Sequence, residues 1–91
     1  MPESLSRTVT ICNRLGLHAR AAAKFVKTAG QFTSQIVVSR KGQDVSGVSI
    51  MGLMMLAAAP GTQIDIRTMG NDADAALAAL VELVERKFDE D

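Results

Sequence analysis

Two kinds of residue periodicity alternate along this 91-residue chain, and their order limits the folds open to it more than any other feature. Strands are predicted over residues 7–12, 32–38 and 62–68, where polar and apolar side chains alternate. A further strand is predicted over residues 43–48, because the Lys41-Gly42 turn before it is typical of a hairpin. Helices are predicted where apolar residues recur at spacings of three and four, over residues 19–29, 50–55 and 72–88. The resulting order, β-α-β-β-α-β-α, indicates an α/β two-layer sandwich (α+β), in which an antiparallel sheet is covered on one face by three helices.

The last predicted helix has the clearest pattern. Asp72 and Asp74 lie near its start, where the partial positive charge of a helix favours carboxylates. Its apolar residues follow the spacing of one buried face, at Leu77, Leu80, Val81, Val84 and Phe88. The first predicted helix has a similar stripe, at Ala19, Ala22, Ala23, Val26 and Ala29. Residues 1–5 are expected to form a flexible lead.

A chain of this length is expected to form a single domain over residues 1–91, because one core usually occupies about 100–150 residues. No apolar run approaches the roughly 20 residues that a membrane-spanning helix needs. The start of the sequence lacks the pattern of an export signal, and Cys12 is the single cysteine. These features predict a cytoplasmic protein that has no membrane partner.

Formal charges balance over the whole chain but not over its two halves. Basic residues prevail in residues 1–45 and acidic residues in residues 46–91. The balance argues against nucleic acid as a partner, whereas the basic half suits a localised phosphate or an acidic protein. Ordinary solvated faces would give the same distribution, so charge alone does not select a function.

The only histidine, His18, lies where a predicted strand and loop are followed by a predicted helix. The first N–H groups of a helix have no acceptor within it, so this position offers hydrogen-bond donors to an anion. Neutral imidazole is nucleophilic near pH 7, and its N-phosphoryl product releases the phosphoryl group readily. The backbone N–H groups of Ala19 and Arg20 and the Arg20 guanidinium are the candidate phosphate donors. These residues predict a site for phosphate on His18.

Other interpretations of the histidine stay open at this point. A single histidine at a loop-helix junction is more often a cap or a surface residue than a catalyst, and a serine distant in sequence can still pair with it. One cysteine and one histidine are too few for a zinc site, and the sequence has no glycine-rich nucleotide loop. Neither a metal nor a cofactor is therefore expected.

The segment around the histidine resembles the active-site signature of a known family. Leu15-Gly16-Leu17-His18-Ala19-Arg20-x-Ala22 is similar to the signature of HPr, the histidine phosphocarrier of the bacterial phosphoenolpyruvate-dependent phosphotransferase system. The resemblance extends from about residue 6 to residue 88. It implies the same β-α-β-β-α-β-α order, with the four antiparallel strands arranged 1-4-2-3.

The resemblance also implies roles for individual residues. His18 would be phosphorylated on Nδ1, with phosphorylated enzyme I as the donor and a IIA-type protein as the acceptor. Arg20 matches the family arginine that contacts the phosphate. Ala21 departs from the pattern, since many relatives have proline there; alanine restores one N–H group and loosens the first turn, which should change the transfer rate more than the mechanism. The chain would be a phosphoryl carrier with a phosphohistidine intermediate, and not an enzyme.

Ser49 begins the short predicted helix and lies in a segment, Val48-Ser49-Ile50-Met51-Gly52, that looks like the regulatory serine segment of HPr. The resemblance implies HPr kinase/phosphorylase as a further partner. A plain N-cap is the alternative, and one serine can serve both purposes. A phosphate at this position is expected to weaken docking to enzyme I.

A docking surface for partners is expected beside the histidine. The short helix has more apolar residues than one buried face needs, and methionine adapts to partners of different shape. Lysines on the first helix would form a charged rim. The expected contact residues are Ala23, Lys24, Lys27, Ile50, Met51 and Met54.

Several functions compete for this sequence. Two segments, Phe88-Asp89-Glu90-Asp91 and Asn13-Arg14-Leu15-Gly16, look like NPr, the nitrogen-related branch of the family. The segment around Ser49 looks instead like serine-regulated HPr, and we lean slightly toward a regulatory system over sugar uptake. An RNA-binding domain would stack bases on aromatic side chains of its strands. Only Phe32 of the three phenylalanines is at a predicted strand, which argues against this function. A purely interacting regulator of the same fold would not need both His18 and Arg20. A monomer is expected.

Overall fold

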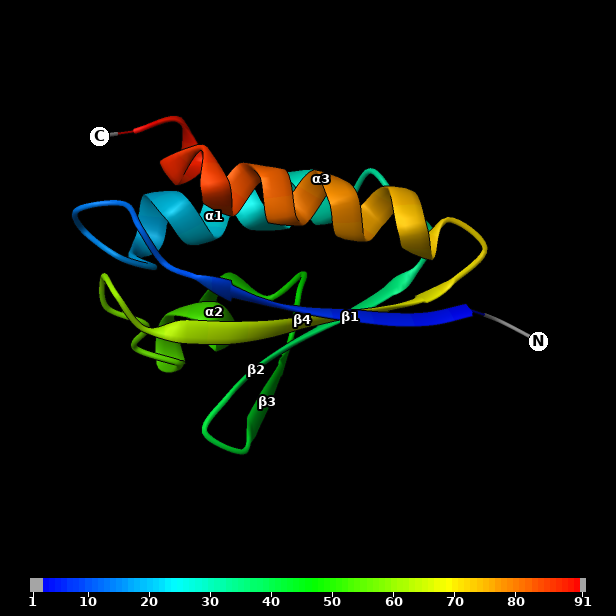
Figure 1. The fold of residues 1–91 in the computed structure, drawn as a ribbon, viewed down its shortest axis with the longest axis horizontal. Coiled ribbons are helices and arrows are strands. Elements are labelled where there is room, and N and C mark those ends of the chain that lie inside the picture. The colour runs from blue at the N-terminus through cyan, green and yellow to red at the C-terminus, as the bar shows by residue number, and fades with distance from the viewer. Residues whose placement is uncertain (1–2, 91) are drawn as a thin grey trace.

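A computed structural model describes residues 3–90 as a sheet with helices packed on it (Figure 1). Its elements in chain order are β1 Glu3–Thr10, α1 Ala19–Ala29, β2 Gln35–Arg40, β3 Gln43–Ser46, α2 Ile50–Met55, β4 Gln63–Gly70, α3 Ala73–Glu85 and the short turn η1 Lys87–Asp89. All strand pairs are antiparallel, and the strand order is β1-β4-β2-β3. The predicted fold class, element order and strand order are confirmed.

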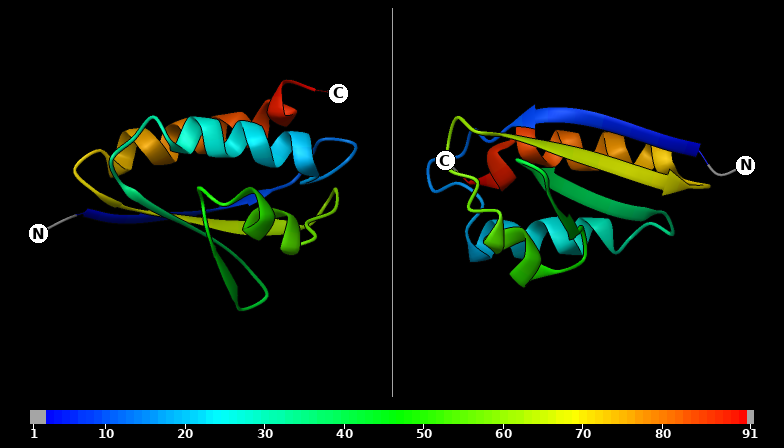
Figure 2. Two further views of the ribbon diagram at one scale, coloured as in Figure 1. Left: turned by 180° about the vertical axis from the view of Figure 1, so that it is seen from behind. Right: turned by 90° about the horizontal axis from the view of Figure 1, so that it is seen from below.

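The core lies between the sheet and the two long helices. Helices α1 and α3 lie side by side over one face of the sheet, and α2 contacts α1 and β3 (Figure 2). Every second residue of the central strand β4 points into the core, and Ile64, Ile66 and Thr68 are at most 1 % exposed. The apolar stripe predicted for α3 is buried against them. None of the helices over residues 3–90 is long and apolar enough to cross a membrane.

Two predicted strands start three or four residues away from the observed first residue. β1 begins at Glu3, which pairs with Gly70, so residues 3–5 belong to a strand and not to a flexible lead; residues 1 and 2 lie outside the described range. Residues 32–34 form a bend before β2. Their alternation resembles a strand, but a carboxylate takes the N–H groups of Thr33 and Ser34 that a strand ladder would use.

The buried face of α1 also differs from the predicted stripe. It consists of Ala21, Ala22, Phe25 and Ala29, whereas Ala23 is exposed. Phe25 explains the difference, because turning its large ring into the core removes far more apolar surface from water than turning an alanine inward. Ala23 therefore remains on the surface.

The prediction that the last helix extends to Phe88 is wrong. Helix α3 ends at Glu85, and Lys87, Phe88 and Asp89 form a left-handed turn with φ values of 60°, 55° and 59°. The Phe88 ring is nevertheless fully buried, at 0 % exposure, and the turn packs against α1 and α3. The spacing correctly predicted that Phe88 is buried in the core, but it wrongly predicted a helical backbone conformation for this residue.

Asp72 ties the start of α3 to the bend before β2. Its carboxylate accepts the N–H groups of Thr33 and Ser34, each over 2.9 Å, and the Ser34 hydroxyl as well. These hydrogen bonds, that of the Ser34 hydroxyl most, lower the pKa of Asp72 below its ordinary value of 3.8. Asp72, which the sequence predicts at the start of a helix, thus binds the backbone of the bend that precedes β2.

Replacing Asp72 by asparagine is expected to lower the melting temperature by about 5 °C at neutral pH, the size of effect typical for losing one charge-assisted hydrogen bond in a domain of this length. Because the folded-state pKa is lowered, this stabilisation is complete above pH 3.8 and is lost as the pH falls through the lowered pKa. Thermal melts of both proteins at several pH values measure the difference. Asp74→Asn is the control, since Asp74 accepts the N–H of the adjacent Ala75. Equal losses in the two variants would contradict the assignment.

Candidate functional site

The loop between β1 and α1 holds His18 at the N-cap position of α1. Gly16 has a φ of +71°, and a side chain there would lie 2.7 Å from the Ala58 carbonyl oxygen, so the loop closes tightly on the segment before β4. The N–H of Leu17 donates to the same oxygen over 2.9 Å, and its side chain is buried. His18 follows this anchored residue with its side chain 27 % exposed.

The start of α1 presents free hydrogen-bond donors beside the histidine. Its first bond joins the N–H of Ala22 to the carbonyl oxygen of His18 over 2.8 Å. The N–H groups of Ala19, Arg20 and Ala21 precede this bond and have no acceptor within the helix. The predicted donors of Ala19 and Arg20 therefore directly follow His18 in the chain, and Ala21 adds a third because it is not proline. Such a helix start can bind an anion.

The side chain of Glu90 contacts the His18 ring from the far end of the sequence. Its Oε1 and Oε2 lie 2.9 and 3.1 Å from Nε2 of the imidazole, and its side chain is only 17 % exposed. The hydrogen bond with His18 is the main cause that lowers the pKa of Glu90 below its ordinary 4.5, and Asn13 and the charge of Arg20 lower it further against the effect of burial. Glu90 is therefore a carboxylate at neutral pH.

Asn13 fixes the position of this carboxylate. It is fully buried, and its Nδ2 donates to the carbonyl oxygen of Gly16 over 2.7 Å and to Oε1 of Glu90 over 2.9 Å. Both neighbours are acceptors, so the amide nitrogen must face them and a flipped amide is excluded. Its Oδ1 is buried and finds no hydrogen-bond partner among residues 3–90.

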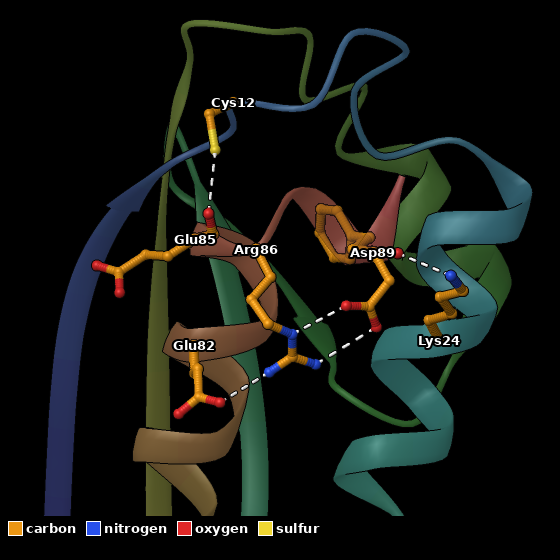
Figure 3. A network of polar contacts seen from close by, with 7 residues as sticks. Cys12, Lys24, Glu82, Glu85, Arg86 and Asp89 are labelled. Carbon is orange, nitrogen blue, oxygen red and sulfur yellow. Dashed lines mark hydrogen bonds and ion pairs between the residues drawn. The ribbon is translucent and has the colours of Figure 1, made fainter. Parts of the chain in front are cut away.

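Residues 86–90, which we call the C-terminal strap, carry Glu90 to the histidine. Lys24 of α1 donates to the carbonyl oxygen of Phe88 over 2.8 Å. Arg86 donates to Asp89 and Glu82, each over 2.9 Å, and its guanidinium lowers the pKa of Asp89 (Figure 3). These contacts and the buried Phe88 ring hold the strap against α1 and the end of α3.

A small pocket lies on the outer side of this contact. Arg14, Leu15, Arg20 and Glu90 line it, and its volume is about 160 Å³. Two basic residues and one acidic residue, Glu90, therefore line the same pocket, and Glu90 contacts the histidine.

The predicted docking residues of α2 are on the surface. Ile50, Met51 and Met54, with Met55, are 41–73 % exposed and line an apolar pocket of about 510 Å³. Leu53 is the one buried residue of this helix, which confirms that the apolar excess faces outward. Helix α2 contacts α1, so this surface adjoins the helix that begins at the histidine.

The remaining predicted residues have different surroundings. Ser49 is the N-cap of α2, and its Oγ accepts the N–H of Gly52 over 2.9 Å, as the capping interpretation predicts. Lys27 is exposed, whereas Lys24 is half-buried and engaged with the C-terminal strap. Lys24 thus does not belong entirely to the charged rim that the sequence suggests.

Sequence analysis missed Glu90 and Asn13 as neighbours of the histidine. Glu90 is 72 positions from His18, and no periodicity connects them. Two features of the sequence could have indicated these residues. Asn13 lies in the predicted loop before the histidine, and residues 89–91 are acidic whereas the charged residues near His18 in the sequence are basic.

Comparisons with known proteins identify the family. Residues 5–86 match the family model described as the PTS HPr component phosphorylation site. The phosphocarrier protein HPr of Pseudomonas aeruginosa is 54 % identical over 83 residues, 90 % of this chain and 92 % of that protein. The phosphocarrier protein NPr of Shewanella violacea is 48 % identical over 86 residues, 94 % of each chain. An HPr crystal structure from Thermoanaerobacter tengcongensis has a TM-score of 0.91 and 44 % identity, and the match covers 96 % of this chain and 98 % of that one. The chain therefore belongs to the HPr family of phosphocarrier proteins of the phosphotransferase system.

Proposed function

We propose that this protein carries a phosphoryl group on His18, which it accepts from phosphorylated enzyme I and passes to a IIA-type protein. One observation carries the proposal: the single histidine of the chain is half-exposed at the start of α1, beside three N–H groups without intrahelical acceptors. Membership of a phosphocarrier family supports it. The protein is then itself the substrate of two transfers and turns over no small molecule.

The chemistry needs few groups. The lone pair of Nδ1 attacks phosphorus, the P–Nδ1 bond forms, and the bond between phosphorus and the leaving atom of the donor breaks. Backbone N–H groups of Ala19 and Arg20 and the Arg20 guanidinium hold the phosphoryl oxygens. Phosphoryl transfer depends mainly on positioning and on stabilisation of charge, so these donors suffice without a metal on this chain. Incubation with enzyme I and phosphoenolpyruvate tests the proposal: one acid-labile, base-stable phosphate per chain is expected, and none would contradict it.

The partners are proposed to dock on the surface formed by Ala23, Lys24, Lys27, Ile50, Met51 and Met54. Exposed apolar side chains on α2 and exposed Lys27 on α1 support this surface. The sequence does not single out Leu15 and Val48, which are further exposed apolar side chains, at 62 % and 58 %. A surface rich in methionine suits a carrier that must bind donor and acceptor in turn.

Ser49 is proposed as a site where a kinase of the HPr kinase/phosphorylase type weakens docking. Ser49→Asp is expected to reduce the affinity for enzyme I about tenfold, or about 1.4 kcal/mol, because it places a negative charge at the edge of the docking surface. Ser49→Asn is the matched control, since asparagine caps a helix as well as aspartate but has no charge. Calorimetric titration with enzyme I compares them. Equal affinities of the two variants would count against regulation at Ser49.

We further propose a regulatory or nitrogen-related system over sugar uptake. Relatives at similar identity are named both HPr and NPr, so identity does not separate the branches. The support is the final segment of the chain, whose NPr-like residues include the Glu90 that contacts the histidine. Faster transfer to a nitrogen-type IIA protein than to a sugar-specific one is expected, and the reverse order would favour sugar uptake.

A further inference from the structure

We propose that Glu90 is a positioning residue for the phosphoryl relay: it accepts the Nε2–H of His18 and thereby leaves Nδ1 as the nitrogen that attacks phosphorus. The inference deepens the function proposed above and depends on it. Its basis is the contact of both Glu90 carboxylate oxygens with Nε2, at 2.9 and 3.1 Å.

The carboxylate decides which ring nitrogen has the proton. A neutral imidazole has one N–H and one lone pair, whereas an ionised carboxylate only accepts hydrogen bonds. The proton of neutral His18 must therefore lie on Nε2, facing Glu90. Among residues 3–90, the ring makes its hydrogen bonds through Nε2 alone. Nδ1 keeps its lone pair, which is the electron pair that the P–N bond requires.

The same contact stabilises the phosphorylated ring. When Nδ1 bonds to phosphorus, the proton stays on Nε2 and the ring becomes a cation, while the donor leaves with the electron pair of the broken bond. Glu90 then pairs with that cation, as a buried carboxylate does for the imidazolium of a serine protease triad. In the return step the P–Nδ1 bond breaks and neutral imidazole leaves, which is a better leaving group than an imidazolate. No proton is gained or lost in either direction.

The surrounding structure is built to hold this carboxylate. Asn13 directs both bonds of its amide nitrogen to Gly16 and Glu90, although its own buried oxygen has no hydrogen-bond partner among residues 3–90. Three consecutive residues before Glu90 adopt left-handed backbone, which is unfavourable for residues other than glycine. Lys24 and the buried Phe88 ring stabilise that backbone. A chain end that merely covered the surface would require none of these features.

Three variants test the inference. Glu90→Gln keeps the shape and removes the charge, and its amide can face Nε2 with either the oxygen or the nitrogen. Glu90→Asp keeps the charge on a side chain one methylene shorter. Glu85→Gln is the matched control, because Glu85 is an exposed carboxylate at the end of α3. Each is compared with the unchanged protein by quench-flow loading from phosphorylated enzyme I, by hydrolysis of the isolated phosphoprotein, and by ¹⁵N NMR of the neutral His18 ring.

Glu90→Gln is expected to load about 10–100-fold more slowly, by analogy with the loss found when the hydrogen-bond partner of a metal-binding histidine is removed. Its phosphoprotein should hydrolyse more slowly, because the protonated ring is less populated, and its NMR spectrum should report a mixture of tautomers in place of Nε2–H alone. Glu90→Asp should recover part of the loading rate, and Glu85→Gln should match the unchanged protein. Unchanged or faster loading of Glu90→Gln would overturn the inference, as would slower loading with an unchanged tautomer and hydrolysis rate. If the unchanged protein accepts no phosphate, the function proposed for His18 fails, and the NMR comparison still decides whether Glu90 sets the tautomer.

Discussion

Replacing His18 by alanine is expected to abolish phosphorylation by enzyme I completely, which is the largest functional effect available to a single substitution in this chain. His18 is the only histidine, so no second imidazole can take over. Within the described residues 3–90, the side chain makes its hydrogen bonds to one partner, Glu90, and it is partly exposed, so the free energy of unfolding should change by less than about 1 kcal/mol. Radiolabelled phosphoenolpyruvate with enzyme I measures the phosphate, and urea denaturation measures the stability.

Arg20→Lys provides the intermediate case for the same assay. A lysine keeps the charge but not the planar pair of donors, so loading should slow while the final amount of phosphate stays at one per chain. An acid-labile phosphate on the His18→Ala variant would contradict the assignment of the site, whatever the rates of the other variants. Loss of stability in His18→Ala by several kcal/mol would instead indicate that the ring has a structural role.

Local signals in the sequence predicted most of the fold. The alternation at Ile64, Ile66 and Thr68 relates residues two positions apart, and the apolar stripe of α3 relates residues three and four positions apart. The structure buries both sets of side chains, as predicted. Ser49 illustrates the same point, because an N-cap interacts with the N–H group three residues ahead. Interactions of this kind join residues a few positions apart, so a local sequence pattern records them.

Predictions failed where distant residues compete for the same backbone groups. The pattern of residues 32–34 favoured a strand, yet Asp72 takes two of their N–H groups across 38 and 39 positions. The stripe of the last helix included Phe88, yet the chain reverses into a left-handed turn after Glu85. The contact of Glu90 with His18 spans 72 positions and leaves no periodic trace. The sequence thus predicted the candidate histidine and the helix that starts beside it, but not the carboxylate that contacts the histidine.

Phe88→Ala is expected to be the most destabilising substitution in the C-terminal strap, at about 3–5 kcal/mol, because it empties a fully buried aromatic site. Domains of this size have total stabilities of about 5–15 kcal/mol, so a large share of the fold's stability would be lost. The left-handed backbone at this position remains unfavourable for alanine, and the ring that stabilises it is gone. Urea denaturation measures the loss, and a change below about 1 kcal/mol would show that the ring is not needed.

Phe25→Ala separates the stability of the core from the positioning of Glu90. Phe25 is also fully buried, but it lies within α1 and not in the strap, so its loss should cost a similar amount of stability. Only Phe88→Ala should also release the strap, because the ring is next to the carbonyl that Lys24 binds and two residues before Glu90. The His18 ring of folded Phe88→Ala should then give the mixed-tautomer ¹⁵N spectrum expected of Glu90→Gln, whereas folded Phe25→Ala should keep the Nε2–H spectrum. The same spectrum in both variants would mean that the buried ring does not connect the core to the histidine.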